Sequence, residues 1–142
     1  MNRQNVLFLC TGNSARSQMA EAFLRKYASD RFEVYSAGLD PQGINPLTRQ
    51  VMSEAGVSLE DHWSKSIDDL EQRNFSFIIT VCGHAEDHCP RVFLSAAEKH
   101  LFWHFEDPAA AQGTEVQKLE KFRLIRDQIE EKIRSWIQDE HA

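Results

Sequence analysis

The chain has 142 residues, of which 42% are hydrophobic and 27% charged, and this composition is typical of one globular domain with a single core. The net charge of −6 argues against a nucleic-acid partner, because phosphate backbones are bound by clustered Lys and Arg. The apolar runs have strand length, and no basic and apolar leader precedes the first of them. We therefore expect one domain over residues 1–142, cytoplasmic, monomeric and without membrane contact.

Four strands alternate with helical segments in the predicted order of elements. Short apolar runs rich in β-prone residues predict strands at 5–10, 31–38, 75–82 and 100–105. Helical spacing and capping residues predict helices at 17–28, from Pro46 to a stop at Gly56, around Ser66–Asp69, and from Thr114 onward. Helical crossovers favour parallel pairing, so the order predicts an α/β fold with three layers: a four-stranded, mainly parallel sheet with helices on both faces.

The last helix has the clearest amphipathic pattern. Thr114 and Gln117 form a capping pair at its start. Its apolar stripe consists of Val116, Leu119, Phe122, Ile125, Ile129, Ile133, Trp136 and Ile137. We expect this helix to pack on the sheet, and its sequence indicates no chemistry of its own.

Three chemically distinctive segments follow the carboxyl ends of predicted strands. The stretch 10–17 follows the first strand, Cys82 ends the third, and Asp107-Pro108 follows the fourth. In open α/β sheets, ligands bind at this edge of the sheet. We therefore expect the three segments to share one site.

The first of these segments has the features of an oxyanion-binding loop; it reads Cys10, Thr11, Gly12, Asn13, Ser14, Ala15, Arg16 and Ser17. Gly12 can adopt a positive φ, and Asn13 is one of the few other residues that tolerate one. Such a turn points backbone N–H groups inward above a helix N-terminus, where the fork of Arg16 can bind two more oxygens. The same field favours the Cys10 thiolate, and Ser17 can donate a hydrogen bond to the sulfur. For isolated residues, a buried thiol beside a surface arginine would be the simpler interpretation.

These residues resemble the C-x5-R-S loop of the low-molecular-weight protein tyrosine phosphatase fold. The stretches SQMAEAF (17–23), VCGHAEDHCP (81–90) and EDPAA (106–110) make nearly the whole chain similar to the thioredoxin-coupled arsenate reductases built on that fold. The resemblance implies that the loop binds arsenate, with phosphate or sulfate as analogues, that no cofactor or metal is bound, and that thioredoxin is the external reductant.

The resemblance also implies a relay through the chain's three cysteines. Cys10 attacks arsenate held by the loop and Arg16, while Asp107 protonates the leaving oxygen as a general acid. Cys82 then attacks Cys10, releasing arsenite and leaving a Cys10–Cys82 disulfide. Cys89 attacks Cys82, and thioredoxin reduces the resulting Cys82–Cys89 disulfide. Each cysteine therefore has one role: nucleophile, relay and resolving thiol.

Other functions remain open at this stage. A phosphatase of the same fold would form a phosphocysteine at Cys10, with weak ester hydrolysis as a side activity even in a reductase. Ala109 and Ala110 stand where the family's phosphatases commonly have tyrosines, which weakens that alternative. A thiol sensor could use the Cys82–Cys89 pair alone. A zinc site could use these two cysteines with His84 and His88, although their spacing lacks the paired pattern of zinc ligands.

Some reductases of this family hold a potassium ion near the loop. Asn13, Glu21 and Ser36 match three of the ligand positions in this sequence, whereas Lys65 stands at the fourth, which is acidic in those proteins. We therefore expect the Lys65 ammonium to replace the cation.

Overall fold

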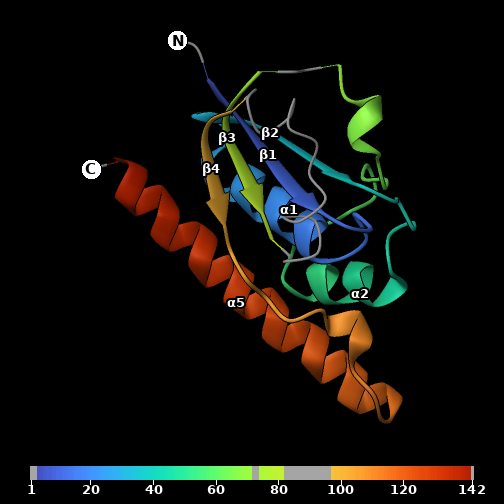
Figure 1. The fold of residues 1–142 in the computed structure, drawn as a ribbon. Helices are drawn as coiled ribbons and strands as arrows, with labels where there is room; N and C mark the ends of the chain where they lie inside the picture. The colour runs from blue at the N-terminus through green and yellow to red at the C-terminus, as the bar shows by residue number, and fades with distance from the viewer. Residues whose placement is uncertain (1–2, 72–73, 82–96, 142) are drawn as a thin grey trace.

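A four-stranded parallel sheet forms the centre of the computed structural model, which describes residues 3–71, 74–81 and 97–141. Its strands are β1 (Gln4–Cys10), β2 (Phe32–Gly38), β3 (Phe75–Thr80) and β4 (Ala97–Phe102), in the spatial order β2-β1-β3-β4 (Figure 1). All three neighbouring pairs are parallel. The expected α/β fold with a four-stranded parallel sheet is therefore confirmed.

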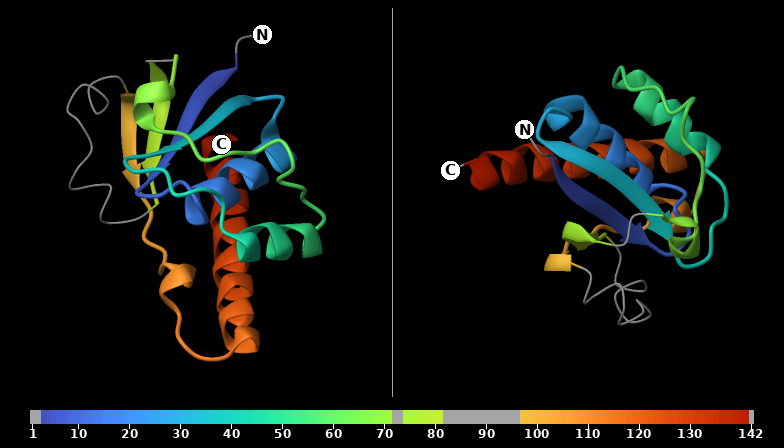
Figure 2. Two further views of the ribbon diagram at one scale, coloured as in Figure 1. Left: turned by 90° about the vertical axis from the view of Figure 1, so that its right-hand side faces the viewer. Right: turned by 90° about the horizontal axis from the view of Figure 1, so that it is seen from above.

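Three α-helices and two short 3₁₀ turns complete the described structure. They are α1 (Arg16–Ala28), α2 (Pro46–Glu54), η1 (Ile67–Asp69), η2 (Pro108–Ala110) and α5 (Glu115–His141). Helices α1 and α5 pack together along the sheet, and α2 lies against α5 at the end of the sheet where β1 and β3 stop (Figures 1 and 2). The long helix α5 therefore contacts both of the shorter helices, α1 and α2.

Both faces of the sheet are covered. On the face that carries α5, Trp136 of that helix stacks on Phe32 and makes an edge contact with Phe77. Alternate residues of a strand point to opposite faces. Leu7 and Ile78, which lie on the other face, are nonetheless fully buried. The central strands β1 and β3 are therefore apolar on both faces, as expected for a parallel sheet, whereas the edge strand β4 exposes Glu98 and Lys99.

The boundaries of several elements differ from the prediction. The strand expected at 100–105 is Ala97–Phe102, although the Trp103 N–H still donates to the Thr80 carbonyl oxygen. One backbone hydrogen bond therefore joins β3 to the residue directly after β4, although the strand itself ends at Phe102. The helix expected from Ser17 begins at Arg16, and the one expected to run to Gly56 ends at Glu54. Shifts of one or two residues are common at element ends, where hydrogen bonds are shared with turns, but the three-residue shift in β4 is larger.

Caps and apolar spacing correctly located the helices. The Asn45 side chain accepts from Leu47 N, and Thr114 and Gln117 bond reciprocally before α5. The α5 stripe is buried at Phe122, Ile125, Ile129, Ile133 and Trp136. Val116 is an exception, because it lies in the first turn of α5 and is 64% exposed.

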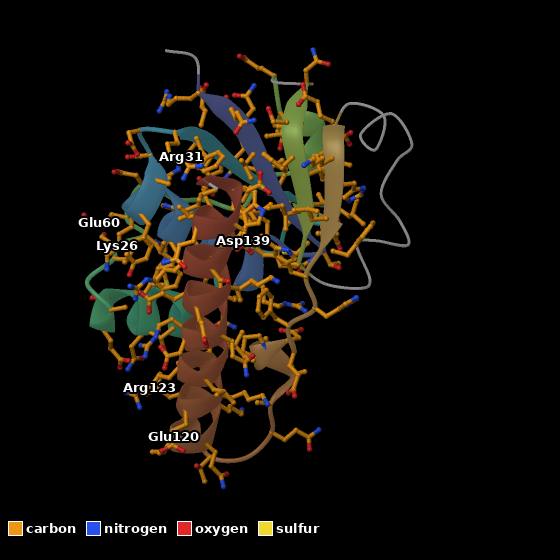
Figure 3. The ribbon with its side chains drawn as sticks, turned by 90° about the vertical axis from the view of Figure 1, so that its left-hand side faces the viewer. Lys26, Arg31, Glu60, Glu120, Arg123 and Asp139 are labelled. Atoms are coloured by element: carbon orange, nitrogen blue, oxygen red, sulfur yellow. The ribbon has the colours of Figure 1, made fainter. Side chains whose placement is uncertain are left out.

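Charged side chains cover the outer surface of α5 and its neighbours (Figure 3). Arg123 of α5 forms two hydrogen bonds with the Glu54 carboxylate of α2, at 2.8 and 2.7 Å, and Arg126 contacts the same carboxylate. The hydrogen bonds from Arg123, supported by the charges of Arg123 and Arg126, lower the pKa of Glu54. No helix among the described residues is both long enough and apolar enough to span a bilayer.

Candidate active site

The loop between β1 and α1 is held by the segment that follows β2. The Cys10 and Thr11 carbonyl oxygens accept from the N–H groups of Leu39 and Asp40, and the Gly12 carbonyl accepts from Gln42. These bonds turn the loop's carbonyl groups towards the 39–45 segment. The carbonyl groups therefore point away from the centre of the loop, where an anion would sit.

The Cys10 sulfur lies at the base of this loop and is almost fully buried. Its Sγ is 2.8 Å from Ser17 Oγ and accepts a hydrogen bond from Asn13 N at 3.3 Å. Ser17 Oγ itself accepts from Asn13 Nδ2 at 2.8 Å, which leaves the hydroxyl hydrogen available to the sulfur. Two donors therefore converge on a side chain that is a nucleophile when ionised.

The loop leads directly into helix α1. Ala15 stands at the N-cap and provides no side-chain acceptor, so no side chain of the cap residue competes for the first N–H groups of the helix. Arg16 is the first helical residue, and Ser17 follows it inside the buried core. The positive end of the helix therefore faces the same loop that holds the sulfur.

The positive φ of this loop falls on Asn13 and not on Gly12. Asn13 has a φ of 48°, whereas Gly12 is absent from the positive-φ residues of the described chain. The reason lies in the side chain, because the Asn13 amide is anchored by Ser17, Ser36 and the backbone of Lys65. These bonds offset the cost of the left-handed conformation.

Gly38, which only marked the end of a strand in the sequence, is a structural requirement of the site. It pairs with Cys10 across β1 and β2, and a Cβ atom there would lie 2.6 Å from the Thr11 carbonyl oxygen and 2.9 Å from Asn13 N. Real Cβ atoms essentially never come within 3.0 Å of other atoms. Glycine therefore lets β2 approach the anion loop.

Arg16 and Asp107 meet across the mouth of the loop. Arg16 Nη2 lies 3.8 Å from Asp107 Oδ2, and Arg16 Nη1 donates to the Phe105 carbonyl oxygen at 3.0 Å. Asp107 also caps η2, because its Oδ1 accepts from Ala109 N. The segment after β4 is thus placed beside the segment after β1, as the sequence predicted. The Asp107 side chain is 46% exposed, which leaves it open to a ligand.

Behind the loop, Glu21 is buried among positive side chains. Its carboxylate pairs with Arg25 at 2.7 Å, accepts from Ser36 Oγ at 2.5 Å, and lies 3.8 Å from His62 Nδ1. Burial lowers the pKa of His62, and Glu21 raises it by a smaller amount. Burial also lowers the pKa of Lys65, again against the opposing effect of Glu21. A pocket of about 580 Å³ opens to solvent beside this cluster.

These residues do not fit a potassium ion. The Asn13 amide oxygen already accepts two N–H groups, from Gln18 Nε2 at 2.9 Å and Lys65 N at 2.8 Å, and both Glu21 oxygens are engaged. The Lys65 ammonium donates to the Trp63 carbonyl at 2.9 Å, and Glu21 raises its pKa against the larger effect of burial, so the expected replacement of the cation by Lys65 stays a prediction. Arg25, which the sequence analysis did not consider, is the direct cationic partner of Glu21.

The structure brings together Cys10, Arg16, Ser17 and Asp107 with the rest of the loop. Cys82 and Cys89 lie outside the described residues, as do His84 and His88 of the zinc alternative. Sequence reasoning missed Gly38, Gln18 and His62. Gln18 stands within the SQMAEAF stretch, so its position was noticed without a role; nothing in the sequence distinguished His62.

The chain belongs to the low molecular weight phosphotyrosine protein phosphatase family, whose model matches residues 5–141. One curated relative, an arsenate reductase of Halalkalibacterium halodurans, is 40% identical over 138 residues, covering 97% of this chain and 98% of its own. The loop, the buried cysteine and the facing aspartate are therefore those of a protein in this family.

Solved structures agree with this assignment. A structure described as an arsenate reductase in the phosphate binding state superposes with a TM-score of 0.81 at 29% identity, covering 96% of this chain and 98% of that chain. A thioredoxin-dependent arsenate reductase of Corynebacterium glutamicum gives a TM-score of 0.74 at 32% identity, covering 96% of this chain and 61% of the other.

Proposed function

We propose that this protein is an arsenate reductase that converts arsenate to arsenite in arsenic detoxification. The observation that carries the proposal is the buried Cys10 sulfur, held by Ser17 and Asn13 inside an anion loop that Arg16 and Asp107 face. The relatives described as arsenate reductases support the choice of substrate.

The first step joins sulfur to arsenic. The Cys10 thiolate attacks the arsenic of arsenate bound by the loop N–H groups and the Arg16 fork, and a Cys10 S–As(V) bond forms. An oxygen of arsenate leaves as water after taking a proton from Asp107. Ser17 and Asn13 stabilise the thiolate before the attack, because both direct a hydrogen towards Sγ.

The second step reduces arsenic. The Cys82 thiolate attacks Cys10 Sγ, a disulfide forms, and the electron pair of the S–As bond stays on arsenic, which leaves as arsenite. Cys89 then attacks Cys82 and returns Cys10 to its thiolate, leaving a Cys82–Cys89 disulfide. Two thiols lose two electrons and arsenic gains them, so the balance closes.

The position of β3 supports the relay. Val81, the residue directly before Cys82, donates its N–H to the carbonyl oxygen of Leu9, the residue directly before Cys10. Successive Cα atoms are about 3.8 Å apart, so Cys82 starts one residue from a backbone that is hydrogen-bonded beside the nucleophile. Reach between the two sulfurs is therefore compatible with the chain's connectivity.

Thioredoxin is the proposed external reductant of the Cys82–Cys89 disulfide. The structural relative from Corynebacterium glutamicum is described as thioredoxin-dependent, which supports this donor. We further propose that the protein works as a cytoplasmic monomer, as one domain over residues 1–142, without a bound cofactor.

The test is oxidation of NADPH that depends on arsenate, with thioredoxin and thioredoxin reductase present. We expect Cys82→Ser and Cys89→Ser each to abolish turnover, whereas Gln50→Met on the exposed face of α2 should leave it unchanged. Mass spectrometry of protein treated with arsenate but no reductant should find the Cys82–Cys89 disulfide, and in Cys89→Ser the Cys10–Cys82 disulfide. Three free thiols after that treatment would refute the relay.

A phosphatase acting through a phosphocysteine is the second candidate, and the family match favours considering it. Phosphate-ester turnover that survives Cys82→Ser and Cys89→Ser, without arsenate-dependent oxidation of NADPH, would support it. Weak ester hydrolysis alone does not discriminate, because the loop accepts any tetrahedral oxyanion.

A further inference from the structure

Gln18 is a fully buried polar residue of α1 that the mechanism above does not use. We propose that Gln18 is a positioning residue, which clamps Asn13 so that its N–H points at the Cys10 sulfur, and that His62 fixes the orientation of Gln18. This inference deepens the proposed function, since the clamp acts on the nucleophile of that function.

The Gln18 amide nitrogen contacts three oxygen atoms, two of Asn13 and one of Trp63. Nε2 lies 3.1 Å from the Asn13 backbone oxygen, 2.9 Å from Asn13 Oδ1 and 3.0 Å from the Trp63 backbone oxygen. Gln18 thus contacts both the backbone and the side chain of Asn13. It also links α1 to the segment that precedes η1.

The surroundings of Gln18 fix its amide orientation. Two of the groups facing Nε2 are backbone carbonyls, which can only accept, so the nitrogen must lie on that side. The oxygen Oε1 therefore faces His62 Nδ1 at 2.9 Å, and Nδ1 must donate. His62 then carries a hydrogen on Nδ1 whether its ring is neutral or charged, and the bond persists in both states.

Asn13 links the Gln18 contacts to the Cys10 sulfur. Its φ of 48° is a conformation that residues other than glycine rarely adopt, and its backbone oxygen is held by Ser64 Oγ at 2.7 Å as well as by Gln18. The same residue directs its N–H to Cys10 Sγ and its Nδ2 to Ser17 Oγ. Loosening Asn13 would weaken both donors that stabilise the Cys10 thiolate, one directly and one through Ser17.

The experiment measures how fast iodoacetamide alkylates Cys10 at different pH values, read on the Cys10 peptide by mass spectrometry in the full-length protein. In Gln18→Met, which keeps the length of the side chain but removes its hydrogen bonds, we expect the pH midpoint of alkylation to rise by roughly 0.5–1 unit. Gln50→Met, on the exposed face of α2, should keep the wild-type midpoint. Ile129→Val, a substitution in the buried face of α5, should lower the melting temperature and keep the midpoint.

A pair of His62 variants tests the second half of the proposal and still decides it if Gln18→Met does not fold. In His62→Asn the amide nitrogen can take the place of Nδ1 and donate to Gln18, so the midpoint should stay near the wild-type value. In His62→Leu no donor remains, and the midpoint should rise as in Gln18→Met. Equal midpoints in the two His62 variants, an unchanged midpoint in Gln18→Met, or the same rise in Ile129→Val would each overturn the proposal.

These measurements need neither arsenate nor thioredoxin. A failure of the clamp therefore leaves the proposed reduction standing, and a failure of the reduction leaves the clamp measurable.

Discussion

Replacing Gly38 by alanine tests whether the close approach of β2 shapes the anion loop. The added Cβ would lie 2.6 Å from the Thr11 carbonyl oxygen and 2.9 Å from Asn13 N. Both are backbone atoms, which no rotamer change can move. The loop or the strand end must therefore shift as a whole.

The size of the shift follows from the contact distance. Ordinary van der Waals contact begins at 3.4 Å, so the Thr11 oxygen and the new methyl group must separate by about 0.8 Å. Overpacking of this kind costs roughly 1–3 kcal/mol of folding free energy. For a chain of 142 residues, we expect the melting temperature to fall by roughly 3–10 °C. The displaced atoms belong to the anion loop, so anion affinity should fall as well.

Thermal unfolding with and without inorganic phosphate measures both effects. Phosphate bound to the native loop should raise the melting temperature of the wild type. At a phosphate concentration of one hundred times the dissociation constant, the free energy of unfolding should increase by about 2.7 kcal/mol. In Gly38→Ala, the increase in the free energy of unfolding caused by the same phosphate concentration should be smaller by about 1.4 kcal/mol for each tenfold loss of phosphate affinity.

Gly56→Ala is the matched control for a strained alanine away from the loop. Gly56 has a φ of +78°, and a Cβ added there would meet no atom within 4 Å, so alanine is strained at this position without touching the site. It should lower the melting temperature and keep the full gain from phosphate. A Gly38→Ala protein with wild-type phosphate stabilisation would refute the argument from close approach.

Three further results are expected. Exchanging potassium for sodium at equal ionic strength should change neither the melting temperature nor the rate of arsenate reduction, because Arg25 already neutralises Glu21; a marked preference for potassium would contradict this. Burial lowers the pKa of His62 in the folded state, so the unfolded chain binds more protons near pH 6.5 and stability should fall as the pH drops through that value. Denaturant unfolding of His62→Asn should show a weaker fall. In denaturant unfolding, Asn13→Ala should be less stable than Asn13→Gly by about 1–2 kcal/mol, because both variants lose the amide but only alanine is strained at a φ of 48°. Equal stabilities of the two variants would argue against that strain.

Local patterns in the sequence were sufficient to predict most of the fold. The apolar run before Cys10, the Asn45 cap and the stripe of α5 each depend on neighbours within a few positions, and each is found where it was expected. The turn between β1 and α1 was predictable for the same reason, because it and the helix after it are contiguous in sequence, while its binding of an anion stays a prediction. The strand expected at 100–105 shifted to Ala97–Phe102, because the apolar residues after Phe102 pack without continuing the assigned strand.

Contacts between distant segments could not be predicted in this way. Gly38 is needed because β2 lies against the loop, and that distance exists only in the folded chain. His62 is 44 positions from Gln18, and Lys65 is 52 from Asn13, so neither hydrogen bond leaves a pattern in the sequence. The expected replacement of a cation by Lys65 stays a prediction, and one local contact beside it was overlooked. Arg25 lies one helical turn after Glu21 and reaches the carboxylate first.

The described residues define the half of the chemistry that phosphatases and reductases share. In the mechanism that we propose, Arg16 binds a tetrahedral anion, Cys10 attacks its central atom and Asp107 protonates a leaving oxygen, whichever element stands at the centre. The fate of the Cys10 adduct then depends on whether water or a second thiol reaches it. Val81, the last described residue before Cys82, donates its N–H to the carbonyl oxygen of Leu9, the residue directly before the nucleophile. We propose that this connection favours attack by a tethered sulfur over attack by water, so that the reductive outcome depends on the segment after β3 and not on the anion loop.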